Sequence, residues 1–367
     1  MHRITIVTDA WHPQVNGVVR SIENTIRELK PRGAEIHLIT PTGFRSVPCP
    51  TYPEIRLSIT RYSRVAAMLA AAQPSFVHIA TEGPLGLLAR RWCLKNGKPF
   101  TTCYHTRFPE YVAARFPLPE SLLYRFVRWF HNAGAACMVA TESLERELLG
   151  KGLRNPVRWT RGIDTLLFCP REKSPSPLGL RRPVFASIGR VAPEKNLKAF
   201  LDLDLPGSKL VVGDGPARAS LEAAYPDVLF TGVKLGEELA RLFAEADVFV
   251  FPSKTDTFGN TILEALASGV PVAAFPVTGP VDILKDHPDA GALSPDLGEA
   301  CRKALSCSPA AARALAETYS WAAASQQFLD NILEANDVRP GRRLGIKRAV
   351  RAIRNVRHRR RGQPVHG

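Results

Sequence analysis

Two acidic residues frame the start of a predicted helix in the segment FPSKTDTFGNTILEALASGVPVAAF, residues 251–275. Asp256 lies in the loop after an apolar strand, and Glu264 lies a turn or two inside the helix that follows. At a helix start the N–H groups of residues 257–261 lack intrahelical acceptors and favour an anion, and Gly259 removes side-chain bulk where that anion would approach. The spacing predicts an anion site whose carboxylates accept hydrogen bonds from sugar hydroxyls. In the alternative interpretation, Asp256 is a helix-start charge and Glu264 is a solvated surface residue.

Two cations accompany another predicted helix start, in the segment IGRVAPEKNLKAF, residues 188–200. Arg190 follows the end of a strand, and Lys195 stands at the entry to the helix. Positive charge combined with directed N–H donors suits a diphosphate group. The alternative is a pair of ordinary surface cations. A turn with the sequence VVGDGP (211–216) ends the next strand and is a weak signal by itself, because such turns are common.

Two further motifs concern phosphate and metal ions. The first strand-to-helix loop, DAWHPQVNGVV (9–19), has a single glycine, Gly17, and lacks the G-x-G-x-x-G pattern of dinucleotide-binding loops. Gly17 predicts a close backbone approach to a phosphate or a sugar, or alternatively an ordinary turn. The one D-x-D string, Asp202 and Asp204, falls where a helix is predicted to end, and we do not interpret it as a metal site.

Strand patterns alternate with helix patterns along most of the chain. Apolar runs that end in polar residues occur at 3–9, 34–40, 76–82, 99–106 and 136–142, and again at 184–190, 208–215, 228–233, 246–253 and 270–275. This alternation predicts an α/β protein with two tandem doubly wound, Rossmann-like domains, whose ligands bind where the carboxyl ends of the strands face a cleft between the domains. The predicted divisions are a first domain (1–168), a linker (169–183), a second domain (184–320), a closing helix (321–337) and a basic amphipathic or disordered tail (338–367).

Charge is distributed unevenly over the 367 residues, which carry a net charge of +15. Residues 1–170 carry +10, residues 171–338 carry −6 and residues 339–367 carry +11, which indicates an anionic partner for the first domain and the tail. The seven cysteines are scattered without a C-x-x-C pair, as expected for reduced thiols in a cytoplasm. The sequence contains no run of about eighteen apolar residues, so no membrane-spanning helix is predicted.

Two basic segments match an anionic membrane surface. Residues 107–131 interleave arginine with aromatic residues, and residues 342–361 place apolar residues near one helical face among many arginines. A basic amphipathic helix of this kind binds anionic lipid, at about 1 kcal/mol for each cation near the surface. The alternatives are a packed core helix at 120–131 and a solvated, disordered tail.

The segments GRVAPEKN, VVGDGP, TGV and ADVFVFPSKTDTFGNTILEALASGVPV together resemble the retaining glycosyltransferases of family 4, which have the GT-B fold. The resemblance extends over about residues 3–330. The usual family signature has two glutamates separated by seven residues, and here the first position is Asp256 and the second is Glu264. Aspartate at the first position resembles a branch that includes glycolipid-forming and mannosyl transferases.

The resemblance implies roles for the residues of the motifs. Arg190 and Lys195 would bind the donor diphosphate, Glu264 the ribose and Asp256 the transferred sugar. His105, in TTCYHTRFPEYV, would stand near the reactive face of the sugar. The remaining donor-binding positions are the close-approach glycine and the backbone amides at the helix start: Gly17, Phe258, Gly259, Asn260 and Thr261.

The implied activity is transfer of a hexose, with retention, from a nucleotide diphosphate sugar to a membrane lipid such as diacylglycerol. UDP-glucose or UDP-glucuronate is the favoured donor, no metal or cofactor is expected, and the enzyme would lie peripherally on the inner face of the cytoplasmic membrane. Alternatives within the same chemistry are a GDP-mannose-dependent mannosyltransferase and a transferase to a polysaccharide or other soluble acceptor. A sugar-nucleotide epimerase and a nucleic-acid-binding protein are alternatives of other classes, although no nucleic-acid partner is expected because no nucleic-acid-binding fold is recognised.

Overall fold

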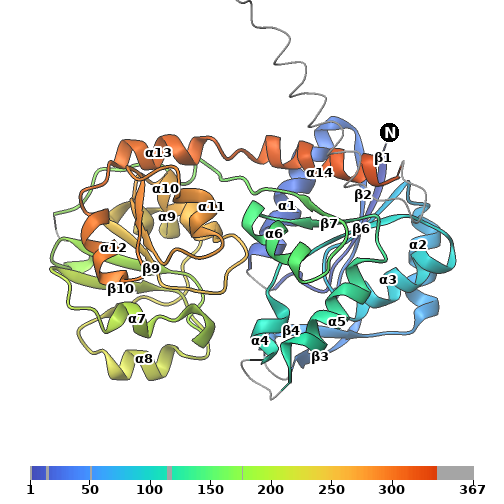
Figure 1. Ribbon diagram of the computed structural model, residues 1–367, viewed down its shortest axis with the longest axis horizontal. Coiled ribbons are helices and arrows are strands. Elements are labelled where there is room, and N and C mark those ends of the chain that lie inside the picture. Colours follow the sequence, from blue (N-terminus) through green and yellow to red (C-terminus); the bar gives the residue numbers. More distant parts are fainter. Residues whose placement is uncertain (1, 14–15, 50–51, 114–117, 176, 337–367) are drawn as a thin grey trace, which may run out of the picture.

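Two parallel β-sheets form the framework of the protein (Figure 1). The computed structural model describes residues 2–13, 16–49, 52–113, 118–175 and 177–336. The first sheet has the order β2-β1-β5-β6-β7-β8 and the second β11-β10-β9-β12-β13-β14. The strands of the first are β1 (His2–Val7), β2 (Ala34–Ile39), β5 (Phe76–Ile79), β6 (Phe100–Cys103), β7 (Ala136–Val139) and β8 (Pro156–Arg158). Those of the second are β9 (Val184–Ile188), β10 (Ser208–Val212), β11 (Leu229–Phe230), β12 (Val248–Phe251), β13 (Val272–Ala274) and β14 (Gly291–Leu293). The predicted pair of doubly wound domains is confirmed.

Helices cover both faces of each sheet, so the central strands are buried along their whole length. Every residue of β5, β6, β7, β9, β12 and β13 is buried, as expected for strands of a parallel sheet. The first domain contains α1 (Gly17–Leu29), α2 (Tyr62–Ala72), α3 (Pro84–Lys95), α4 (Phe108–Ala113), α5 (Glu120–His131) and α6 (Glu142–Gly150). The second contains α7 (Lys198–Leu201), α8 (Arg218–Ala224), α9 (Gly236–Glu245), α10 (Asn260–Ala267), α11 (Pro280–Leu284), α12 (Leu297–Ala304) and α13 (Pro309–Glu317).

An antiparallel hairpin in the first domain was not expected from the sequence. It consists of β3 (Arg45–Cys49) and β4 (Tyr52–Ile59), which pair with each other outside the two parallel sheets. In the sequence this region follows the second strand and contains several prolines, which disfavour strand pairing. No helix in the described part of the chain combines the length and the apolar composition needed to cross a bilayer.

The last helix, α14 (Trp321–Asn336), leaves the second domain and packs on the first (Figure 1). It lies against α1 and against strands β5 and β6. The ring of Phe328 stands 5.0 Å from that of Trp159 and 4.9 Å from that of His78, all in the core of the first domain. The closing helix is therefore a structural part of the first domain, although it follows the second in the sequence.

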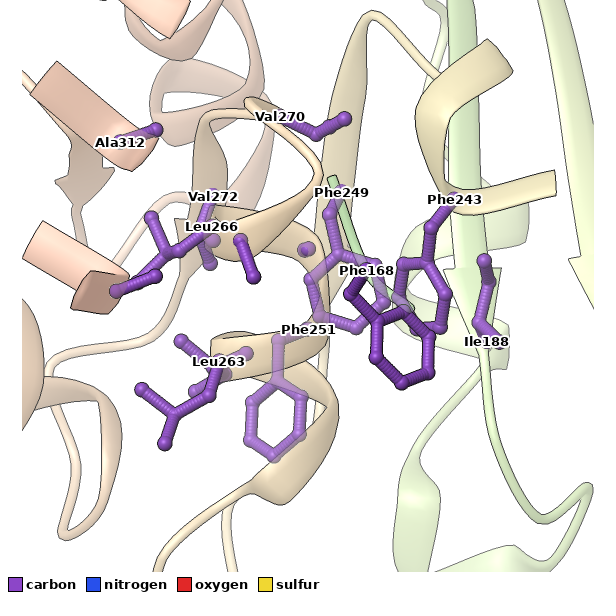
Figure 2. Close-up of a cluster of buried hydrophobic side chains, with 14 of the residues drawn as sticks. Phe168, Ile188, Phe243, Phe249, Phe251, Leu263, Leu266, Val270, Val272 and Ala312 are labelled. Atoms are coloured by element: carbon purple, nitrogen blue, oxygen red, sulfur yellow. The ribbon is translucent and has the colours of Figure 1, made fainter. Parts of the chain in front are cut away.

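The inner face of α10 is fixed by the apolar core of the second domain (Figure 2). Leu263 and Leu266 of the helix are buried in the same cluster as Phe249 and Phe251 of β12. Complete burial of a leucine or phenylalanine side chain contributes about 1.5–3 kcal/mol. The strand before α10 and the helix itself therefore form a rigid unit that sets the position of the helix start.

Candidate active site

The loop between β12 and α10, residues 252–259, contacts the segment that follows β6 in the first domain. The Thr257 hydroxyl donates to the His105 carbonyl oxygen at 2.9 Å, and Arg107 Nε donates to the Asp256 carbonyl oxygen at 3.3 Å. The Tyr111 hydroxyl donates to the carbonyl oxygen of Thr255 at 3.2 Å. Both segments follow the carboxyl ends of their strands, so the two sheets present these ends to one another at this interdomain junction.

Asp256 and Lys195, which the sequence analysis assigned to sugar and diphosphate, form an ion pair. Lys195 Nζ lies 2.8 Å from both carboxylate oxygens of Asp256. The pair is largely buried, with 26% of the lysine side chain and 17% of the aspartate side chain exposed. Arg190, one short 3-10 turn earlier, lies 3.4 Å from Glu194. Lys195 therefore contacts the loop that carries Asp256, and Arg190 lies beside Glu194, whose carbonyl oxygen accepts from Thr255 of the same loop.

The start of α10 has the backbone geometry of an open helix N-terminus. Gly259 is the N-cap residue, with φ of 90°, and has no side chain to accept from the first-turn N–H groups. A Cβ at this position would lie 2.9 Å from Ile262 Cδ1 and 3.2 Å from Phe251 Cζ. The side chain of Phe258 is buried in the core. The left-handed φ of Gly259 and the buried side chain of Phe258 define the backbone at Asn260 and the preceding residues, whose amides are the predicted donor ligands. Thr261 follows in the same turn.

The N-terminal parts of α1 and α10 lie beside each other across the junction. A Cβ at Gly17 would lie 2.8 Å from Asn260 Nδ2, so the predicted close approach at Gly17 exists and is made to Asn260. One turn further along, Arg20 Nη1 donates to Glu264 Oε1 at 2.5 Å. The sequence analysis did not single out Arg20. Its position three residues after Gly17, on the same helical face, was the available signal.

Glu264 is a buried carboxylate, and one of its two oxygens has no hydrogen-bond partner among the described residues. Only 4% of the residue is exposed, and burial raises its pKa to about 7 although the adjacent Arg20 opposes this change. Oε2 is buried and has no hydrogen-bond partner among the described residues. The alternative interpretation of Glu264 as a solvated surface residue is wrong, because its side chain points into the junction and not into water.

His105 has a neutral imidazole with one free ring nitrogen. Arg161 Nη2 donates to its Nδ1 at 3.3 Å, so the neutral ring carries its proton on Nε2. Burial lowers the pKa of His105 well below 6.5, and the charge of Arg161 lowers it further. Nε2 is buried without a hydrogen-bond partner among the described residues. His105 therefore offers an N–H donor at neutral pH and not a transferable proton.

The D-x-D string lies on the surface at the end of α7. Asp202 caps that helix and pairs with Lys198 at 2.8 Å and with the hydroxyl of Tyr225. Within the described ranges no three His, Cys, Asp or Glu side chains are grouped so that they could hold a metal ion. The ion pair with Lys198 gives Asp202 a structural role at the helix end.

Known proteins with similar sequences identify the family to which this chain belongs. The sequence profile of Glycosyltransferase Family 4 matches residues 15–167, and that of Glycosyl transferases group 1 matches residues 182–307. A GDP-mannose-dependent alpha-mannosyltransferase of Mycobacterium tuberculosis is 30% identical over 312 residues, which cover 78% of this chain and 82% of that protein. The chain belongs to glycosyltransferase family 4. An alpha-monoglucosyldiacylglycerol synthase of Streptococcus pneumoniae is 28% identical to the family 4 chain over 316 residues, or 74% of this chain and 70% of that protein.

A solved structure confirms the fold of the family 4 enzyme. The crystal structure of Anabaena Alr3699/HepE in complex with UDP-glucose superposes with a TM-score of 0.67 at 14% identity, over 89% of this chain and 98% of that one. The two facing Rossmann-like domains are thus those of the GT-B fold. The protein is a hexosyltransferase that uses a nucleotide sugar.

Proposed function

We propose that the protein is a retaining hexosyltransferase that acts on a lipid at the inner face of the cytoplasmic membrane. The observation that carries this proposal is the junction of His105 with the loop of Asp256, because it brings predicted sugar-contacting groups from both domains to one place. In the proposed complex the diphosphate binds Arg190, Lys195 and the start of α10, and Glu264 Oε2 accepts a hydrogen bond from the ribose.

The proposed reaction needs two developing charges to be stabilised. The bond between the anomeric carbon and the diphosphate oxygen breaks, and its electron pair leaves with the diphosphate. Arg190, Lys195 and the helix start stabilise that charge by preorganised electrostatics, so the proposal requires no metal ion. The acceptor oxygen bonds to the same face of the anomeric carbon, and its proton passes to the leaving phosphate oxygen. His105 donates its Nε2 proton in a hydrogen bond to a sugar hydroxyl and stays neutral throughout.

Two classes of donor are supported. The M. tuberculosis relative is named for GDP-mannose, and it is the more similar of the two relatives described above. The Anabaena neighbour was crystallised with UDP-glucose, and the S. pneumoniae relative is named for a glucosyl product. We therefore propose GDP-mannose as the first donor to test, alongside UDP-glucose and UDP-glucuronate, which the sequence analysis favoured.

A lipid acceptor is supported by the outer surface of α2, α3 and α5. These three helices carry six Lys or Arg residues and one acid, Glu120. Trp129 and Leu122 of α5 are 52% and 53% exposed, and the Arg90 guanidinium lies 3.8 Å from the Trp129 ring centre. Exposed tryptophan and leucine among cations suit an anionic membrane interface.

The predicted membrane segment at 107–131 serves two purposes in the structure. Its inner side packs in the core, as in the alternative interpretation of a packed core helix at 120–131, because Tyr124 and Phe130 are buried. Arg107 donates to both carboxylate oxygens of Glu147. Its outer side carries the exposed residues of α5. Arg115 and Phe116 lie outside the described residues, as does the basic tail at 338–367.

The test of this function is transfer from labelled donors. Purified enzyme is incubated with GDP-mannose, UDP-glucose or UDP-glucuronate and with either a bacterial lipid extract or soluble glycans. We expect label in the organic phase with one donor, and none after Lys195→Ala, since the departing diphosphate loses a cation. Lys198→Ala, on the surface of α7, is the matched control and should retain full transfer. Normal turnover of the Lys195→Ala variant would show that the diphosphate site is assigned to the wrong residues. Label found only in the soluble glycans would show that the acceptor is a glycan and not a lipid.

A further inference from the structure

Helices α1 and α10 are joined by an ion pair that the activity described so far does not use. Arg20 Nη1 and Glu264 Oε1 are 2.5 Å apart, although the two residues are 244 positions apart in the sequence. The arginine side chain is 36% exposed, whereas the glutamate side chain is only 6% exposed. The cation thus reaches from the edge of the first domain to a carboxylate that is buried in the second.

The other elements that pack around Glu264 either present apolar side chains to it or carry charged side chains that are bonded to other groups. Strands β12 and β13 are apolar and buried, and the buried face of α9 is formed by leucine, alanine and phenylalanine. On α13, Arg313 donates to the carbonyl oxygens of Ala267 and Phe168 and to Glu317. Among the described residues, Arg20 is the cation that lies against the Glu264 carboxylate.

The two oxygens of this carboxylate have different environments. Oε1 accepts from Arg20, and Oε2 is buried without a hydrogen-bond partner in the described structure. A buried acceptor without a hydrogen bond is unfavourable, and a hydroxyl donor at Oε2 would remove that cost. The hydroxyl of a ribose is such a donor. An ionised phosphate group has no O–H to donate, so binding of phosphate at this position would leave Oε2 unsatisfied.

We propose that Arg20 is a positioning residue for nucleotide binding, which holds Glu264 by Oε1 so that Oε2 accepts a hydrogen bond from the ribose. This inference rests on the proposed role of Glu264 as the ribose ligand. Arg20 also favours the ionised form of the buried carboxylate, because its charge opposes the effect of burial on the pKa of Glu264. Since Arg20 belongs to the first domain, the affinity of the second domain for a nucleotide depends on the contact between the domains.

The experiment measures binding by calorimetry with three probes. These are GDP or UDP, whichever binds more tightly, its 2′,3′-dideoxy analogue, and inorganic pyrophosphate. For Arg20→Ala we expect the affinity for the full nucleotide to fall about tenfold or more, because the hydrogen bond between the ribose and the charged Glu264 is lost. Binding of the dideoxy analogue and of pyrophosphate should be unchanged, because neither offers a ribose hydroxyl. Arg20→Lys should recover part of the affinity.

Arg27→Ala is the matched control, because Arg27 is exposed on the same helix and is bonded to Asn24 of that helix. Its binding of all three probes should equal that of the unaltered protein. If Arg20→Ala does not fold, as judged by circular dichroism, Arg20→Gln keeps the length and removes the charge, and the same comparison applies.

A pH series separates positioning from a merely structural effect. Nucleotide affinity of the unaltered protein should fall as the pH drops below about 7, where Glu264 gains its proton. In Arg20→Ala the pKa of Glu264 rises further, so the fall begins at higher pH, and part of the loss persists at pH 9 because Oε1 is no longer held. An unshifted pH profile in Arg20→Ala would show that Arg20 does not act on Glu264 and would overturn the proposal.

Two other outcomes separate this inference from the function on which it rests. If Arg20→Ala weakens pyrophosphate as much as nucleotide, or weakens neither, Arg20 does not act through the ribose and the inference fails. If Glu264→Gln also leaves nucleotide affinity unchanged, Glu264 is not the ribose ligand and the proposed role of the site fails with it.

Discussion

The proposed chemistry depends on ionisable residues that are buried at the junction between the domains, and their burial lowers the stability of the fold. Glu264 is held inside the protein with a pKa near 7, and His105 is held neutral beside Arg161. Asp256 is held by Lys195. Residues of this kind are kept because a buried group binds a ligand strongly, although burial of its charged form is unfavourable.

Glu264→Gln should show this cost as a change in the pH dependence of stability. Burial raises the pKa of Glu264 from its ordinary value of 4.5 to about 7, so the folded state binds the proton more tightly than the unfolded state. Glu264 therefore contributes a loss of stability of about 3 kcal/mol as the pH rises from 4.5 through 7, and the glutamine variant lacks this contribution. Urea denaturation at pH 5 and pH 8 measures the difference. Identical pH dependence in both proteins would contradict the assigned pKa.

The residue scale also shows what the sequence could predict. Asp256, Glu264, Arg190 and Lys195 were found because each lies at a fixed distance from a helix start within one local motif. Arg20 was not found, because its partner is decided by how two domains dock and not by a local pattern. Pairs of this kind require the structure.

Helix α10 is the element that turns these residues into a site, because its start combines an uncapped N-terminus with a core that prevents movement. The left-handed φ of Gly259 sets the direction in which the first amides point, and Ile262 and Phe251 leave no room for a side chain at this position. The sequence predicted this helix and the position of Gly259 at its start. It did not predict the hairpin of β3 and β4, nor the docking of α14, because an amphipathic pattern reveals a buried face but not its partner.

Gly259→Ala should damage both stability and donor binding. An alanine at positive φ costs about 1–2 kcal/mol, and the new Cβ would also approach Ile262 Cδ1 to 2.9 Å. Gly43→Ala is the control, because Gly43 has a similar φ of 87° but nothing lies within 4 Å of its added Cβ. We expect a lower melting temperature for both variants and a higher KM for the donor only for Gly259→Ala. Equal KM values in the two variants would show that the helix start does not bind the donor.

At the scale of the whole molecule, the charge distribution separates two surfaces. The first domain is basic and exposes Trp129 and Leu122, whereas residues 171–338 carry a net charge of −6. In the proposed function, an anionic membrane would attract the first domain and repel the second, so the acceptor side of the molecule would face the lipid.

Deletion of residues 339–367, which lie outside the described residues, should move the protein from the membrane to the soluble fraction. The segment carries eleven Lys or Arg residues and no acid, and its loss removes most of the attraction to anionic lipid. Hydrolysis of the donor should persist, because the junction is intact. Sedimentation with vesicles of phosphatidylglycerol, at low and high salt, measures the change. Unchanged sedimentation of the shortened protein would assign attachment to the surface of α2, α3 and α5.

The position of α14 has a consequence for how the protein is made. Phe328 and Ile332 fill the core of the first domain next to Trp159, yet the ribosome synthesises them after the entire second domain. The first domain must therefore wait with an open apolar face while its neighbour emerges and folds. A nascent chain that is halted before α14 should bind chaperones through that face, and release of the last helix should complete the first domain.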